Sequence, residues 1–160
     1  MIWHNGFCVR TETVAGEPYP VVYWDASAIL SVLFTDTHSE SARALAHQAG
    51  LHLVSTLAYS ETCAVIARLQ RDRVLADVLI HAAFEVLEEG PWRRLTAWPD
   101  WSTVRSLAVK WPLRGADLWH LALIKSLQAQ LPEIRLLTFD ARLHSAAEGE
   151  SLVGENMPHP

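Results

Sequence analysis

The sequence lacks any apolar run long enough to cross a membrane, and it has few cysteines. No apolar stretch reaches the roughly 18 residues that a bilayer-spanning helix needs. The start, Met1-Ile2-Trp3-His4-Asn5, has neither the basic nor the long apolar region of a signal peptide. The two cysteines, Cys8 and Cys63, do not have a metal-binding spacing. These absences predict a cytoplasmic protein that has free thiols and no membrane contact.

Charged residues are also scarce. They make up 19% of the 160 residues, apolar residues make up 50%, and the formal net charge is -5. This balance predicts a single globular domain with a substantial core and excludes a disordered chain. The negative charge argues against a general nucleic-acid coat protein. It does not argue against a nuclease, because the acids of a nuclease attract a metal ion first.

Short apolar runs alternate with helix-like segments along most of the chain. The runs predict strands over residues 21–25, 51–54, 94–98, 134–138 and 151–153. Helices are expected over residues 26–34, 39–49, 56–69, 73–88, 101–110, 115–129 and 141–147. This alternation predicts an α/β fold with three α/β/α layers and a mainly parallel central sheet. Residues 1–20 are the least regular part and are expected to form an N-terminal arm, which leaves 21–160 as the domain.

Four acidic residues stand where the pattern predicts burial. Asp25 and Asp140 each end a strand-like run, while Glu61 and Asp117 lie on the apolar faces of predicted helices. An acid on such a face costs free energy unless a cation compensates it. Strand ends and the helix starts that follow them meet at one edge of a parallel sheet, so we expect the four acids to converge there. Carboxylates grouped around a divalent ion are suited to phosphoryl chemistry, which predicts a Mg²⁺ or Mn²⁺ site.

Each acid also has a structural explanation. Asp117 could be a surface acid that stabilises a helix dipole. Glu61 could be a buried acid paired with Arg68 or another base. Asp140 could be the N-cap of the last helix, which is compatible with metal binding. His120, one turn after Asp117, fits a packed histidine that hydrogen-bonds this acid better than it fits a catalytic group. Four coincidences together nevertheless favour one shared site.

Four segments, in this order, resemble the PIN domain. They are Val22-Tyr23-Trp24-Asp25-Ala26-Ser27-Ala28, Ser55-Thr56-Leu57-Ala58-Tyr59-Ser60-Glu61, Gly115-Ala116-Asp117-Leu118-Trp119-His120-Leu121-Ala122 and Leu137-Thr138-Phe139-Asp140. The resemblance covers about residues 20–154 and extends to the ribonuclease toxins of bacterial VapBC toxin–antitoxin pairs. It implies a metal-dependent ribonuclease whose catalytic and metal-binding residues are Asp25, Glu61, Asp117 and Asp140. Ser27 and Thr138 match the hydroxyl positions that support this set.

The same resemblance implies partners for the chain. The substrate would be RNA, and a small cognate antitoxin would cover the acidic pocket. Some of the seven tryptophans at the surface would suit a homodimer or a partner interface. Residues 1–20 depart from the toxin pattern, in which the chain begins close to the first strand. The alternative is therefore a housekeeping PIN nuclease that acts in RNA processing.

Other protein classes that place acids at strand ends fit less well. A phospho-acceptor receiver domain needs an adjacent acidic pair after its first strand, where this chain has Trp24 before Asp25. It also needs a lysine after a late strand, where Ala141 and Arg142 follow Asp140. A haloacid-dehalogenase phosphatase needs a second aspartate where Ser27 stands. A non-catalytic interaction module remains possible, but the presence of all four acids argues against it.

Overall fold

A computed structural model describes residues 20–160 of the chain. The expected arm over residues 1–20 therefore lies, apart from Pro20, outside the described residues. In chain order the elements are β1 (Val21–Trp24), α1 (Ala26–Leu33), α2 (Ser39–Ala46), β2 (Leu51–Ser55), α3 (Thr56–Arg71), α4 (Asp77–Glu89), β3 (Trp92–Leu95), α5 (Trp101–Lys110), α6 (Gly115–Leu127), β4 (Ile134–Leu137) and α7 (Ala141–Gly149). None of these helices is long and apolar enough to cross a membrane.

The four strands form one parallel sheet in the order β3-β2-β1-β4. The first strand, β1, lies between β2 and β4, and Val21 is in register with Leu51 on one side and Ile134 on the other. Strands that alternate with helices cannot return to the sheet by tight hairpins, so each connection crosses over and the strands run the same way. The predicted mainly parallel sheet is confirmed.

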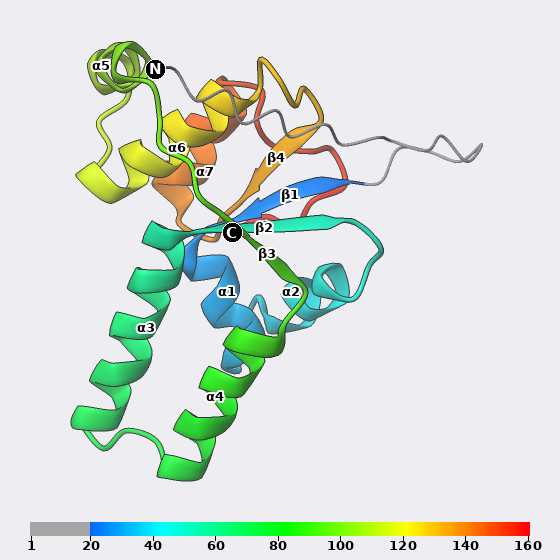
Figure 1. The fold of residues 1–160 in the computed structure, drawn as a ribbon, viewed down its shortest axis with the longest axis vertical. Coiled ribbons are helices and arrows are strands. Elements are labelled where there is room, and N and C mark those ends of the chain that lie inside the picture. The colour runs from blue at the N-terminus through cyan, green and yellow to red at the C-terminus, as the bar shows by residue number, and fades with distance from the viewer. Residues whose placement is uncertain (1–19) are drawn as a thin grey trace, which may run out of the picture.

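Helices cover both faces of the sheet (Figure 1). Successive side chains of a strand point to opposite faces. Val22 and Trp24 of β1 accordingly pack in a core with the apolar residues of α1, α2, α3 and α4. Val21 and Tyr23 pack in a second core with those of α5, α6 and α7. The α/β/α layering expected from the sequence is therefore confirmed, and β1 is buried on both sides.

Residues with left-handed backbone conformation change two of the expected elements. The helix expected from residue 73 begins at Asp77, because Arg73 has a φ of 52° and left-handed residues do not continue a helix. The expected small strand over 151–153 is absent from the described sheet, because Ser151 has a φ of 59°. Leu152 still accepts a hydrogen bond at the sheet edge, from the backbone nitrogen of Leu136.

The third strand also lies earlier than expected. It spans Trp92–Leu95 rather than residues 94–98, and Trp92 is in register with His52 of β2. Burial explains the shift, since Trp92 is covered against the core while Thr96 and Trp98 are exposed. The pattern in the sequence missed Trp92 because two charged residues, Arg93 and Arg94, follow it directly.

Candidate active site

Asp25 is held at the carboxyl end of β1 by three hydrogen bonds. Its side chain caps α1, and Oδ1 accepts bonds from the Ser27 hydroxyl at 2.7 Å and the backbone nitrogen of Ala28 at 2.9 Å. Its Oδ2 accepts a bond of 2.8 Å from the Thr138 hydroxyl. Groups from two distant parts of the chain therefore fix the carboxylate in one orientation. Asp25 is also buried, at 6% exposed.

The same hydroxyls connect β1 to the segment that carries Asp140. The backbone nitrogen of Phe139 donates to the Ser27 oxygen at 2.8 Å, and that of Asp140 donates to the Thr138 oxygen at 3.1 Å. Asp140 then caps α7, because its Oδ1 accepts bonds from the backbone nitrogens of Arg142 and Leu143. The capping explanation for Asp140 is thus confirmed, and its Oδ2 remains available for another ligand.

Glu61 is paired with His120 and not with Arg68. His120 Nε2 lies 2.8 Å from Glu61 Oε2, and His120 Nδ1 lies 2.6 Å from the Tyr23 hydroxyl. The expected bond from His120 to Asp117 is replaced by this contact with an acid of another helix. Tyr23 in turn lies 2.6 Å from the Ser55 hydroxyl. A buried relay therefore runs from β2 through β1 and α6 to Glu61.

The donors and acceptors in this relay follow from Glu61. An ionised carboxylate only accepts, so His120 Nε2 must carry a proton. If the imidazole is neutral, its Nδ1 accepts from Tyr23, and Tyr23 accepts from Ser55. Burial raises the pKa of the Tyr23 hydroxyl, which keeps this group protonated and able to donate. The arrangement satisfies every polar atom of the buried chain without a charged histidine.

Asp117 lies in the first turn of α6, where the helix dipole favours an acid. Its pKa is raised above the ordinary value, first by partial burial and then by the negative charges of Asp140 and Glu61. Arg114, and His120 when its imidazole is protonated, act in the opposite direction. The negative charges of Asp140 and Glu61 therefore act on Asp117 and disfavour its ionised form. The sequence alone could not show that the charges of Asp140 and Glu61 act on Asp117.

Asp25 belongs to the same charge environment but is more deeply buried. Burial raises its pKa, while its three hydrogen bonds and His120 lower it. No lysine or arginine of residues 20–160 forms an ion pair with it. A buried acid without a basic partner is costly, and a bound cation would remove that cost.

The donor set suits a hard divalent cation. All four side chains offer carboxylate oxygens, the ligands that Mg²⁺ and Mn²⁺ prefer. Within residues 20–160, however, no three of these acids bring ligand atoms within 4.8 Å of one another. Mg²⁺ usually retains several waters and takes only one or two carboxylates directly, so such spacing is compatible with it. The acids that remain outside direct contact would act through bound water.

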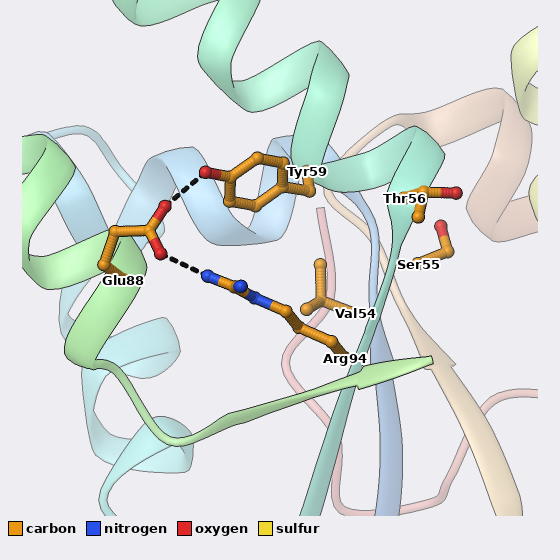
Figure 2. A pocket seen from close by; sticks show the side chains of 6 residues that line it. All are labelled: Val54, Ser55, Thr56, Tyr59, Glu88 and Arg94. Atoms are coloured by element: carbon orange, nitrogen blue, oxygen red, sulfur yellow. Dashed lines mark hydrogen bonds and ion pairs between the residues drawn. The ribbon is translucent and has the colours of Figure 1, made fainter. Parts of the chain in front are cut away.

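A hollow of about 280 Å³ lies beside the relay at the ends of β2 and β3. Figure 2 shows the Glu88 carboxylate between the Tyr59 hydroxyl and the Arg94 guanidinium, both of which donate to it. Arg94 also lies over the Tyr59 ring, 5.5 Å from its centre. Ser55 lines the hollow as well as ending the relay, so the two features adjoin.

Several of these residues escaped the sequence analysis. Tyr23 carried one usable signal, because a tyrosine inside a buried strand needs a partner for its hydroxyl. Tyr59, Glu88 and Arg94 carried none, since they come from three elements and meet only in the folded chain. Asp36 accepts bonds from Ser31, His38 and Ser39 and has a structural role before α2.

A comparison with known protein families identifies the family of this chain. The model of the family described as PIN domain matches residues 22–149. The chain belongs to the PIN domain family. This PIN domain protein is also similar to two curated relatives from Mycobacterium tuberculosis, which confirms the resemblance to VapC ribonucleases. Ribonuclease VapC45 of strain CDC 1551 / Oshkosh and Ribonuclease VapC49 of strain ATCC 25618 / H37Rv are each 35% identical over 132 residues, covering 80% of this chain and 90% of the relative.

Two solved structures share the fold of this PIN domain protein. The crystal structure of Mycobacterium tuberculosis VapC20, described as a Sarcin-Ricin loop cleaving toxin, aligns with a TM-score of 0.51 over 78% of this chain and 94% of that one. PAE2754 from Pyrobaculum aerophilum aligns with a TM-score of 0.55 over 88% and 89%. Both are 15% identical in sequence, so they support the architecture alone.

Proposed function

We propose that this PIN domain protein is a metal-dependent ribonuclease whose catalytic and metal-binding residues are Asp25, Glu61, Asp117 and Asp140. The nuclease domain would comprise residues 21–160. The observation that carries the proposal is the buried Asp25 carboxylate, which the Ser27 and Thr138 hydroxyls orient at the sheet edge. The VapC-type relatives supply the reaction, which is hydrolysis of RNA phosphodiester bonds.

Local contacts of the four acids support the proposal that they share one region. Asp25 and Asp140 cap helices with one oxygen, while His120 holds Glu61 by its Oε2. Asp117 lies in the first turn of α6, which supports its proposed place in the set. These residues would hold Mg²⁺ or Mn²⁺, which when bound polarises the scissile phosphate and lowers the pKa of an attacking water. Ser27, Thr138 and His120 would be positioning residues, since they hydrogen-bond Asp25 and Glu61.

The hollow beside the relay is the proposed place for a part of the RNA. Tyr59 offers a ring on which a base can stack, and Arg94 offers a guanidinium for a phosphate. Both groups now bind the Glu88 carboxylate, so RNA would have to compete with this acid for them. Such competition would favour the multiply charged RNA backbone over small anions.

A small antitoxin is the proposed restraint on this activity. An arginine on such a protein could fork onto the carboxylates of the acidic pocket and block it. The exposed side chains of Trp98 and Trp101, which are 74% and 89% exposed, offer an apolar anchor for a protein partner. A homodimer remains a proposal that would use the same kind of surface, and sedimentation velocity of the purified chain would test it.

The deciding experiment is cleavage of a mixed RNA pool by the purified chain. We expect products in Mg²⁺ or Mn²⁺, none in EDTA, and none from the Asp25→Asn variant. Expression in bacteria then tests the toxin function separately. Growth should stop with the wild-type chain, continue with Asp25→Asn, and recover when the neighbouring gene is coexpressed. Harmless expression of a chain that still cleaves RNA in vitro would indicate a housekeeping nuclease instead.

A further inference from the structure

Three possible metal ligands meet on the far turns of α7, outside the acidic site. His144 and Glu148 stand four residues apart on this helix, so they lie on one face, and His159 approaches from the segment after it. His159 Nδ1 lies 3.2 Å from His144 Nε2, and Glu148 Oε2 lies 3.7 Å from His144 Nδ1. One ligand atom from each of the three side chains lies within 4.8 Å of the others.

The spacing of two ring nitrogens matches that of neighbouring ligands on one ion. The rings stand at 81° with centres 5.2 Å apart, and His159 Nδ1 now faces His144 Nε2 as in a hydrogen bond, so the exposed His159 ring would have to turn for both lone pairs to meet at an ion. In a tetrahedral zinc site with Zn–N bonds of about 2.0–2.1 Å, neighbouring ligand atoms lie about 3.3 Å apart. The observed 3.2 Å is close to that distance.

The protonation of this group also favours a cation. Burial lowers the pKa of His144, and the neighbouring His159 lowers it further, while Glu148 opposes both. A neutral imidazole has a free lone pair, which metal binding requires. Without an ion, the two facing nitrogens can share only one proton. An ion would take the place of that proton and use both lone pairs.

We propose that His144, Glu148 and His159 form a binding site for a transition-metal ion of the zinc type, separate from the acidic site. Two imidazoles and one carboxylate are a common zinc ligand set, in which water completes the tetrahedron. The acidic site, with oxygen ligands alone, suits Mg²⁺ or Mn²⁺ instead. The two sites therefore differ in the metal that they select.

The ion would tie the segment around residue 159 to α7. Asp140 caps the start of this helix, and its backbone oxygen accepts the bond from the nitrogen of His144. Zinc bound one and two turns further along would therefore stabilise the helix that positions a catalytic acid. This role is structural, so it predicts a gain in stability and no new reaction.

Zinc titration of the full-length chain tests the site. The Asp25→Asn background keeps the protein inactive, and an excess of Mg²⁺ occupies the oxygen ligands of the acidic site. In isothermal titration calorimetry we expect one zinc ion per chain, with an affinity at least tenfold weaker in His159→Ala. The His159 side chain is exposed, so this change leaves the fold intact. His81→Ala, at an exposed histidine of α4, is the matched control and should leave zinc binding unchanged.

Two further measurements make the outcome decisive. Co²⁺ in place of zinc should give the intense visible absorption of a tetrahedral site in the parent and in His81→Ala, and should lose it in His159→Ala and Glu148→Gln. Zinc should raise the melting temperature of the parent but not of His159→Ala. Equal zinc affinity in the parent and His159→Ala, or a cobalt spectrum that the two variants do not change, would overturn the proposal.

Discussion

His120 Nε2 lies 2.8 Å from Glu61 Oε2, and this contact joins α6 to α3 across the ends of the central strands. Because His120 is 2% exposed and is also bonded at Nδ1, its ring has little freedom to turn. Glu61 is thereby held by a rigid donor, although its own side chain is about one-third exposed. Preorganisation of this kind reduces the cost of placing a carboxylate around an ion.

Replacement of Asp25 should separate chemistry from folding. Asparagine caps helices as well as aspartate does and keeps an oxygen for Ser27 and Ala28, so Asp25→Asn should fold like the wild type. Its RNA cleavage should fall by more than the about 10–100-fold typical of an outer-shell partner. Asp25→Ala should also lose about 1–3 kcal/mol of unfolding free energy, because it leaves buried donors unpaired. Urea denaturation and RNA cleavage assays measure the two effects, and wild-type cleavage by Asp25→Asn would refute the site.

The relay to Glu61 should respond to the loss of one hydroxyl. Tyr23→Phe leaves His120 Nδ1 and Ser55 without their common partner, at a cost of about 1–3 kcal/mol for the unsatisfied buried groups. We expect a lower kcat with little change in KM, because Glu61 loses its fixed orientation while RNA binding is untouched. Tyr59→Phe is the matched control, since it removes a hydroxyl outside the relay. If both variants lower kcat equally, the relay does not position Glu61.

The raised pKa of Asp117 predicts an unusual dependence on pH. Its pKa in the folded chain lies above the unfolded value, so the ionised side chain destabilises the metal-free protein at neutral pH. That penalty is relieved as the pH falls through the raised pKa toward the ordinary value of about 3.8–3.9 for aspartate. Melting temperatures without metal should therefore be higher for Asp117→Asn than for the wild type at pH 7, and the difference should shrink in acid. A variant that is less stable at pH 7 would show that Asp117 is stabilising.

Metal binding should shift the titration of Asp117 to lower pH. An ion competes with protons for the carboxylates. The raised pKa of Asp117 thus predicts that Mg²⁺-dependent cleavage is lost, as the pH falls, earlier than an ordinary aspartate would require. A pH–rate profile at several Mg²⁺ concentrations measures this loss, and its midpoint should move to lower pH as Mg²⁺ increases. A midpoint independent of Mg²⁺ would exclude competition at these acids.

The hollow in Figure 2 predicts a role for Arg94 in RNA binding. Arg94→Ala should raise the KM for RNA about tenfold, which corresponds to about 1.4 kcal/mol, and leave kcat near the wild-type value. Arg93→Ala is the control, because neighbouring side chains of a strand point to opposite faces. Glu88→Gln should have the reverse effect and lower KM, since it weakens the hold on Arg94. Equal effects of Arg93→Ala and Arg94→Ala would indicate only a general loss of positive charge.

Much of the architecture was predictable because buried positions are occupied by apolar residues in a regular pattern along the sequence. The apolar runs that became β1, β2 and β4 are short, buried on both faces and separated by helices, so they predicted a parallel sheet. Asp25 and Asp140 were found because an acid at the end of such a run is conspicuous. The convergence of the acids rested on topology, and their catalytic role remains a prediction.

The features that the sequence did not predict depend on contacts between residues far apart in the chain or on single backbone conformations. Glu61 and His120 stand 59 residues apart, and a choice between Arg68 and His120 as partner requires side-chain positions in three dimensions. The late start of α4, at Asp77 instead of residue 73, reflects the left-handed backbone of Arg73, a residue type that gives no signal of this conformation. The position of β3 was similarly obscured, because arginines at its solvent-exposed edge hide the buried Trp92.

Because β1 lies between β2 and β4, the surroundings of Asp25 are completed only after β4 has been synthesised. Asp25 is made early, but the Thr138 hydroxyl that binds it comes 113 residues later. During synthesis, Asp25 therefore leaves the ribosome long before the strand that completes its surroundings has emerged. A nascent chain that ends before β4 lacks the Thr138 hydroxyl that orients Asp25, so its site is not yet finished. The topology thus delays the hazard of this nuclease until translation of the domain is almost complete.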